Sequence, residues 1–123
     1  MKIMHKQEPW NGKANFIDEK GTYLGFDYVN NCCESFGWFL SDKKGDWIEG
    51  YEEESMELPG WHFDPSYLVE GGGEEGGGQA EFRIVNGDQE KFLTIYNHHN
   101  GYYGHGFEFV VPTDTTKNRE GCL

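Results

Sequence analysis

The sequence has little positive charge, and this scarcity limits the partners that it can bind. Ten lysines and arginines stand against 22 aspartates and glutamates, which gives a formal net charge of −12 at pH 7. Such a field repels a nucleic-acid duplex and an anionic membrane surface alike. We therefore expect no direct nucleic-acid binding and no membrane association.

Cysteines and long apolar runs are also scarce. The three cysteines are Cys32, Cys33 and Cys122, and an odd number with two adjacent is not the disulfide framework of a secreted domain. The N-terminus lacks the apolar stretch of a signal peptide, and no run approaches the length of a membrane span. These absences predict a cytoplasmic protein.

Aliphatic residues are few, but aromatic residues are many. Hydrophobic residues make up 36% of the chain and aromatic residues 16%. Because each aromatic side chain buries a large area, twenty of them can build a core with few aliphatics. The length of 123 residues predicts a single β-rich domain over 1–123.

Alternating apolar residues predict a mainly β fold, or an α+β fold with little helix, built on an antiparallel sheet. The expected strands lie in Thr22–Val29, Cys33–Leu40, Ala80–Ile84, Phe92–Tyr96 and Phe107–Val111. The last three form a predicted C-terminal three-stranded meander from Ala80 to Val111. Its first turn is Asn86–Gln89, since Asn-Gly accepts positive φ.

The remaining segments give weaker signals. The most helix-like segment is Ile48–Met56, and Trp61 and Phe63 are expected to pack into the core. The acidic, Gly-rich stretch of about 70–79 is expected to be a flexible hairpin tip, and the polar tail 113–123 to be frayed.

The loop 97–106 is the strongest candidate for a ligand site. It holds three of the five histidines, two of the seven tyrosines and three glycines. Aromatic faces stack on bases and amides read their edges, so the loop could hold a nucleotide-type ligand. The predicted ligand-binding residues are Asn97, His99, Tyr102, Tyr103 and His105.

The acidic residues between Asp42 and Glu75 are the strongest candidate for a partner-binding surface. Half of the carboxylates fall in this range, where only Lys43 and Lys44 oppose them. Such a face meets a basic partner, or it is simply a solvated surface. The predicted partner-binding residues are Glu49, Glu52, Glu53, Glu54 and Glu57.

Metal binding and catalysis have weaker support in the sequence. Cys32, Glu34, His105 and one of His98 or His99 could supply four zinc ligands if their loops meet. Adjacent side chains of a strand point to opposite faces, however, so neither pair can grip one ion together. No nucleophile signature accompanies a cysteine or histidine, so we expect no catalytic residue, no metal and no cofactor.

Two short motifs resemble a family of small phage and bacterial proteins of uncharacterised activity. They are Cys32-Cys33-Glu34 and Asn100-Gly101-Tyr102-Tyr103, within stretches that cover about a fifth of the chain. The resemblance implies a phage or prophage setting, hence the cytoplasm of a host cell, and it implies no activity.

The sequence thus predicts a non-enzymatic acidic interaction protein. The expected partner is a host nucleic-acid-binding defence protein, such as a CRISPR effector, which the acidic face would occupy and block. The first alternative is a protein that sequesters a nucleotide immune signal, and the second is a metal-dependent enzyme.

Overall fold

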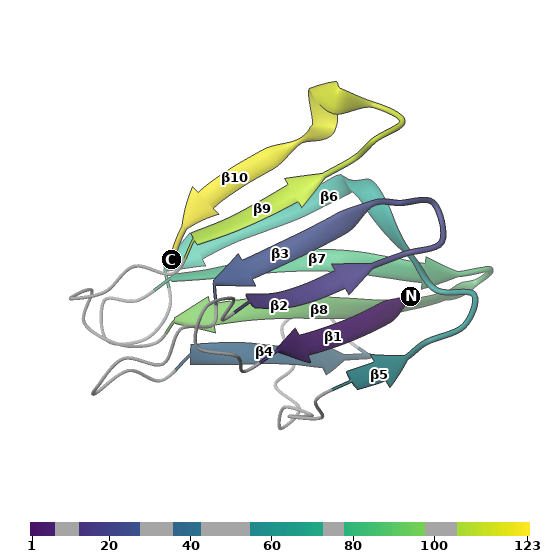
Figure 1. Cartoon of the computed structure of the whole chain (residues 1–123), viewed down its shortest axis with the longest axis horizontal. Coiled ribbons are helices and arrows are strands. Elements are labelled where there is room, and N and C mark those ends of the chain that lie inside the picture. Colours follow the sequence, from purple (N-terminus) through teal and green to yellow (C-terminus); the bar gives the residue numbers. More distant parts are fainter. Residues whose placement is uncertain (7–12, 28–35, 43–54, 73–77, 98–105) are drawn as a thin grey trace.

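The computed structural model describes residues 1–6, 13–27, 36–42, 55–72, 78–97 and 106–123, which form a β-sandwich (Figure 1). Within these residues, strands dominate and helix is limited to one 3-10 turn, Thr115–Lys117. The strands are β1 (Lys2–Lys6), β2 (Lys13–Ile17), β3 (Tyr23–Asp27), β4 (Phe36–Ser41), β5 (Ser55–Glu57), β6 (His62–Gly72), β7 (Gly78–Asn86), β8 (Gln89–Asn97), β9 (Gly106–Val110) and β10 (Arg119–Cys122).

The strands form two antiparallel sheets that lie face to face. The six-stranded sheet has the order β10-β9-β3-β2-β1-β5, and the four-stranded sheet has the order β4-β8-β7-β6. In Figure 1 the six-stranded sheet lies in front of the four-stranded one. The predicted mainly β fold with antiparallel pairing is confirmed.

The predicted C-terminal meander is correct in its first hairpin and wrong in its last strand. β7 and β8 form the hairpin, with Asn86 paired to Gln89 and Gly87 at a φ of 59°. β9, however, pairs with β3 and β10 in the other sheet, because β4 already occupies the second edge of β8. The meander in the structure is β6-β7-β8, one strand earlier.

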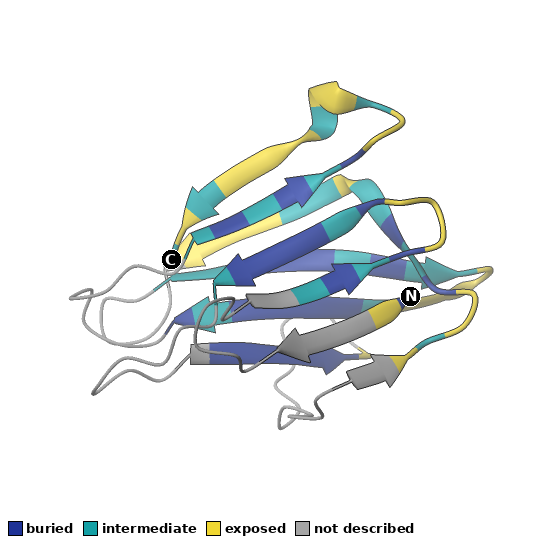
Figure 2. Ribbon diagram, in the orientation of Figure 1, coloured by how far each residue is buried: buried dark blue, intermediate teal, exposed yellow. Residues whose placement is uncertain are grey.

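Aromatic side chains from both sheets fill the space between them. The largest fully buried side chains include Phe16, Phe26, Phe63, Phe82 and Phe109. The ring of Phe109, from the six-stranded sheet, lies 5.2 Å from Phe63 and 5.1 Å from Phe82 of the other sheet. Figure 2 shows the buried residues on the central strands of both sheets. Trp61 and Phe63 are buried, as predicted.

Several segments differ from expectation. The tail is not frayed: β10 pairs with β9, and the Asn118 side chain accepts a 2.7 Å hydrogen bond from Val111 N. Side-chain-to-backbone bonds of this kind give no apolar periodicity, so the sequence did not indicate them. Strands β1 and β2 were not predicted either.

Of the helix-like Ile48–Met56, only Ser55 and Met56 are described, and they belong to β5.

The Gly-rich stretch does connect two paired strands, as expected for a hairpin. Gly72 at the end of β6 pairs with Gly78 at the start of β7. Residues 73–77 lie outside the described part of the chain.

The two ends of the sandwich differ in how their strands are connected. At one end, which we call the turn end, the chain reverses in the short connections 18–22, 58–61 and 87–88. At the other, the loop end, the paired residues Lys6 and Lys13, and likewise Gly72 and Gly78, flank longer connections.

The buried carboxylate of Asp18 joins the two sheets at the turn end. Its Oδ1 accepts hydrogen bonds from Lys20 N at 2.9 Å and Thr22 N at 3.0 Å, within the β2–β3 turn. Its Oδ2 accepts a 3.0 Å bond from Phe63 N in β6 of the opposite sheet. One side chain therefore satisfies three backbone donors and fixes the distance between the sheets at this point.

We expect Asp18→Asn to lower the free energy of unfolding by about 2–4 kcal/mol, because an amide presents one acceptor oxygen where the carboxylate presents two. Urea denaturation measures this loss as a lower midpoint at an unchanged slope. The neighbouring, exposed Glu19→Gln serves as control and should change stability by less than about 0.5 kcal/mol. Equal midpoints for Asp18→Asn and the wild type would contradict the role given to Asp18.

Candidate functional site

The predicted ligand-binding loop begins in one sheet and ends in the other. β8 ends at Asn97 in the four-stranded sheet, and β9 begins at Gly106 in the six-stranded sheet. The chain therefore passes from sheet to sheet between these residues, at the loop end of the sandwich. The other four predicted residues, His99, Tyr102, Tyr103 and His105, lie outside the described residues.

Asn97 is buried, with 1% of its surface exposed. Its Nδ2 donates a 3.3 Å hydrogen bond to the backbone oxygen of Leu123, just beyond β10. Asn97 thus connects the end of β8 to Leu123, the residue that follows β10. This contact fixes the end of β8, from which the predicted ligand-binding loop leaves the sheet.

The two motifs of the resemblance adjoin the ends of neighbouring strands, β4 and β8. Phe36, the first residue of β4, pairs with Asn97, the last residue of β8. Cys32, Cys33 and Glu34 precede Phe36, and Asn100 to Tyr103 follow Asn97; both motifs lie outside the described residues. The register still shows that the two segments leave adjacent strands of the sheet at the same end.

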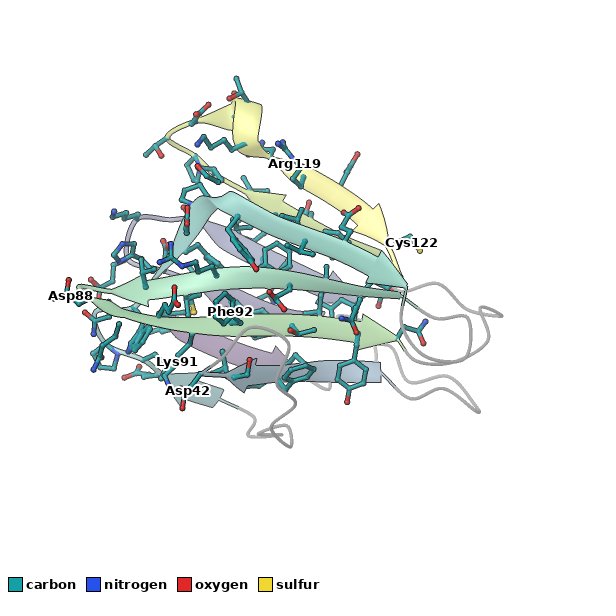
Figure 3. The ribbon with its side chains drawn as sticks, turned by 180° about the vertical axis from the view of Figure 1, so that it is seen from behind. Asp42, Asp88, Lys91, Phe92, Arg119 and Cys122 are labelled. Carbon is teal, nitrogen blue, oxygen red and sulfur yellow. The ribbon has the colours of Figure 1, made fainter. Side chains whose placement is uncertain are left out.

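Two described carboxylates of the predicted acidic surface, Asp42 and Glu57, lie at the turn end, whereas Glu70, near the end of β6, lies towards the loop end. Glu57, at the end of β5, is exposed, and its Oε1 lies 3.9 Å from Lys2 Nζ. Asp42, just after β4, accepts a 2.6 Å hydrogen bond from Lys91, and Figure 3 shows the two residues together. Glu49, Glu52, Glu53 and Glu54 lie outside the described residues.

The structure adds acidic residues from other segments to this end. Glu19 in the β2–β3 turn, Asp88 in the β7–β8 turn and Glu90 in β8 are all exposed. Glu19 accepts a 3.4 Å hydrogen bond from Gly60 N, which joins its turn to the β5–β6 connection. The acidic region is therefore assembled from distant parts of the sequence, and the range 42–75 contains only part of it.

A hollow of about 320 Å³ lies between Glu19 and Glu57. Met1, Ile17 and Pro59 line it together with Lys2 and Asp18. Met1 is held in place by two hydrogen bonds to Leu58: Leu58 N donates to the Met1 carbonyl oxygen at 2.8 Å, and the amino group of Met1 donates to the Leu58 carbonyl oxygen at 2.7 Å. The residues around the hollow thus combine apolar side chains with two exposed carboxylates, the Lys2 ammonium and the amino group of Met1.

The outer face of the four-stranded sheet holds a second polar arrangement. Tyr67 of β6 donates a 2.6 Å hydrogen bond to Glu81 of β7. Glu81 is buried, with 8% of its surface exposed. The ring of Tyr67 also lies 5.7 Å from Phe92 of β8. Burial, reinforced by the hydrogen bond and the negative charge of Glu81, raises the pKa of Tyr67 to about 12. Glu81 alternates in β7 with the core residues Ala80 and Phe82 and so faces away from the core, yet it is buried because Tyr67 covers this face of the sheet.

A raised pKa for Tyr67 gives a signed expectation for alkaline titration. Its phenol ionises near its ordinary value of 10.0 in the unfolded chain and at about 12 in the folded one. Its contribution to stability is therefore complete below pH ~10 and is lost as the pH rises through ~12. Glu81→Gln removes the negative charge and should lower the pKa of Tyr67 towards its ordinary value.

Tyrosinate absorbance measures this titration, and Tyr67→Phe identifies which part of the signal belongs to Tyr67. If Glu81→Gln left the Tyr67 phase of the titration unshifted, the part of the pKa shift assigned to Glu81 would be wrong, and burial alone would account for it.

Other groupings are absent from the described part of the chain. There, no three histidines, cysteines, aspartates or glutamates gather where they could hold a metal ion. Of the cysteines, only Cys122 is described, and it is a free, exposed thiol. Among the described residues no helix is long and apolar enough to cross a membrane.

Comparison with known proteins gives no assignment: neither a protein-family model, nor a curated protein, nor a solved structure matches this chain. The resemblance carried by Cys32-Cys33-Glu34 and Asn100-Gly101-Tyr102-Tyr103 therefore stays a hypothesis.

Proposed function

We propose that this chain is a non-enzymatic interaction protein whose acidic turn end binds a partner protein with a basic surface. The hollow between Glu19 and Glu57 is the observation that carries the proposal. Lysine and arginine side chains combine an apolar stem with a cationic head. The apolar lining suits the stem, and the two carboxylates suit the head.

Lys2 is a weak competitor for this position. Its Nζ lies 3.9 Å from Glu57 Oε1, and both side chains are about 70% exposed, at 68% and 71%. An exposed pair at this distance contributes little to stability. A guanidinium group from a partner can make two parallel hydrogen bonds to one carboxylate, which is a stronger arrangement.

The nature of the partner follows from charge. Proteins that bind nucleic acid present lysines and arginines to the phosphate backbone. An acidic protein can occupy such a surface and exclude the nucleic acid. Together with the phage-like resemblance, this makes a host defence protein that binds nucleic acid, in the cytoplasm, the proposed target. The proposal includes the sequence-predicted residues Glu49, Glu52, Glu53 and Glu54 as further partner-binding carboxylates.

Charge reversal in the hollow tests the proposal. We expect the double variant Glu19→Lys/Glu57→Lys to bind a fluorescent arginine-rich peptide at least about tenfold more weakly than the wild type, a loss of ~1.4 kcal/mol or more. Fluorescence anisotropy at physiological ionic strength measures the affinity. The wild-type interaction should weaken as salt is added, because it is electrostatic.

Glu120→Lys, on the exposed edge strand β10, provides a control for non-specific charge effects. Glu120→Lys changes the net charge by as much as either single reversal in the hollow, but it lies outside the hollow. Most of the affinity for the peptide should therefore remain. If one reversal at Glu120 weakened binding as much as one at Glu57, the hollow would not be the contact site. In cells, the wild type and Glu120→Lys should protect a phage from a defended host, and the double variant should not.

A further inference from the structure

The two edge strands β6 and β10 place charged residues where a sandwich normally places apolar ones. Arg119 of β10 pairs with Phe109, and Gly121 pairs with Phe107. Directly paired residues of an antiparallel sheet share a face, and both phenylalanines are buried. Arg119 and Gly121 therefore lie on the inner face of their sheet.

β6 shows the same departure in the opposite sheet. Leu68 packs against the core, and Glu70, two residues further along a regularly paired stretch, lies on the same face. Val69, between them, is 42% exposed. Polar residues at inward positions leave the sandwich unsealed between β6 and β10, and such departures from pattern tend to occur at functional sites.

A groove of about 500 Å³ lies between these two strands. Ser66, Leu68 and Glu70 line it from β6, Phe109 from β9, and Lys117 and Arg119 from the C-terminal segment. Figure 3 shows Arg119 on β10 beside β6. The volume is within the range of small-molecule sites, about 300–1,000 Å³.

The two cations of the groove are held in position by hydrogen bonds to uncharged acceptors. Lys117 Nζ donates a 2.6 Å hydrogen bond to Ser66 Oγ, across the groove. Arg119 Nη1 donates to the backbone oxygens of Thr116 and Asn118 at 3.1 and 2.8 Å. Among the described residues, neither cation forms an ion pair with a carboxylate; the pairs found involve Lys2, Arg83 and Lys91.

Glu70 makes the two ends of the groove differ in charge. Its Oε1 lies 3.6 Å from the position that a Cβ atom would take on Gly121, so the carboxylate lies beside the distal part of β10. A Cβ there would also meet the Phe107 ring at 2.8 Å, which explains why this position is glycine. The cations and Ser66 thus lie towards one end of the groove, and an acceptor carboxylate lies towards the other.

We infer that this groove binds a small organic phosphate of the nucleotide type. Its phosphate lies between Lys117 and Arg119, where an ammonium, a guanidinium fork and the Ser66 hydroxyl supply donors. Glu70 accepts hydrogen bonds from hydroxyl or amino groups at the other end of the ligand. Leu68 and the edge of Phe109 supply an apolar floor. The site lies apart from the Glu19–Glu57 hollow and does not depend on the function proposed for it.

Calorimetric titration with adenosine monophosphate, adenosine and inorganic phosphate tests the inference on the full chain. Adenosine monophosphate should bind, inorganic phosphate should bind at least tenfold more weakly, and adenosine should not bind measurably. Arg119→Gln and Lys117→Gln should each weaken adenosine monophosphate binding at least tenfold. Lys20→Gln, which removes an exposed cation of the β2–β3 turn, should leave binding unchanged. The thermal unfolding midpoint of each variant shows whether it is folded.

Glu70→Gln separates nucleotide recognition from simple anion binding. Removing its negative charge should strengthen binding of inorganic phosphate and narrow the preference for adenosine monophosphate. Absence of binding by any phosphate, or equal binding by the wild type and both folded cation variants, would overturn the site. Equal affinity of the wild type for adenosine monophosphate and inorganic phosphate would overturn the nucleotide assignment.

Discussion

The carboxylate of Asp18 is the constraint on which both candidate sites depend. It closes the β2–β3 turn through Lys20 N and Thr22 N and binds Phe63 N at the start of β6. The first two bonds place Glu19 at the rim of the acidic hollow. The third fixes the start of β6, the strand that supplies one wall of the groove. Since a buried carboxylate is stable only when its oxygens are bonded, the three contacts form or fail together.

The sequence predicted the strands whose inward residues alternate, and it could not assign them to sheets. Phe107 and Phe109 alternate with Glu108, so β9 was predicted correctly as a half-buried strand. The same pattern would result if β9 paired with β8 or, as it does, with β3. Pairing depends on which edges are already occupied, and β4 occupies the edge of β8. β1 and β2 were missed, and with them the turn that carries Glu19.

The acidic hollow could be predicted in part from the sequence, whereas the groove could not. The excess of carboxylates was evident from composition, and Glu57 was named, but Glu19 joins it only through the fold. Lys117 and Arg119 lie in a polar tail that carries no apolar alternation. Their importance becomes visible only when the register pairs Arg119 with the buried Phe109 and so places it on an inward face. Register is a property of two strands, and no single segment encodes it.

The hollow between Glu19 and Glu57 is acidic, whereas the groove between β6 and β10 carries two cations. Because both lie on the same small protein, its overall charge affects how each ligand approaches. Over distances beyond about 10 Å, a ligand experiences the net charge of −12, reduced by salt screening. A basic protein is attracted by that field, so added salt slows its association. An organic phosphate is repelled by the field until it reaches the groove, where Lys117 and Arg119 act at short range. Added salt therefore weakens two effects: the repulsion of the approaching phosphate by the net charge of the protein, and its attraction to Lys117 and Arg119 in the groove. The net charge thus disfavours anions in general, and at the proposed site an organic phosphate whose other end reaches Glu70 and the apolar floor should bind more tightly than inorganic phosphate.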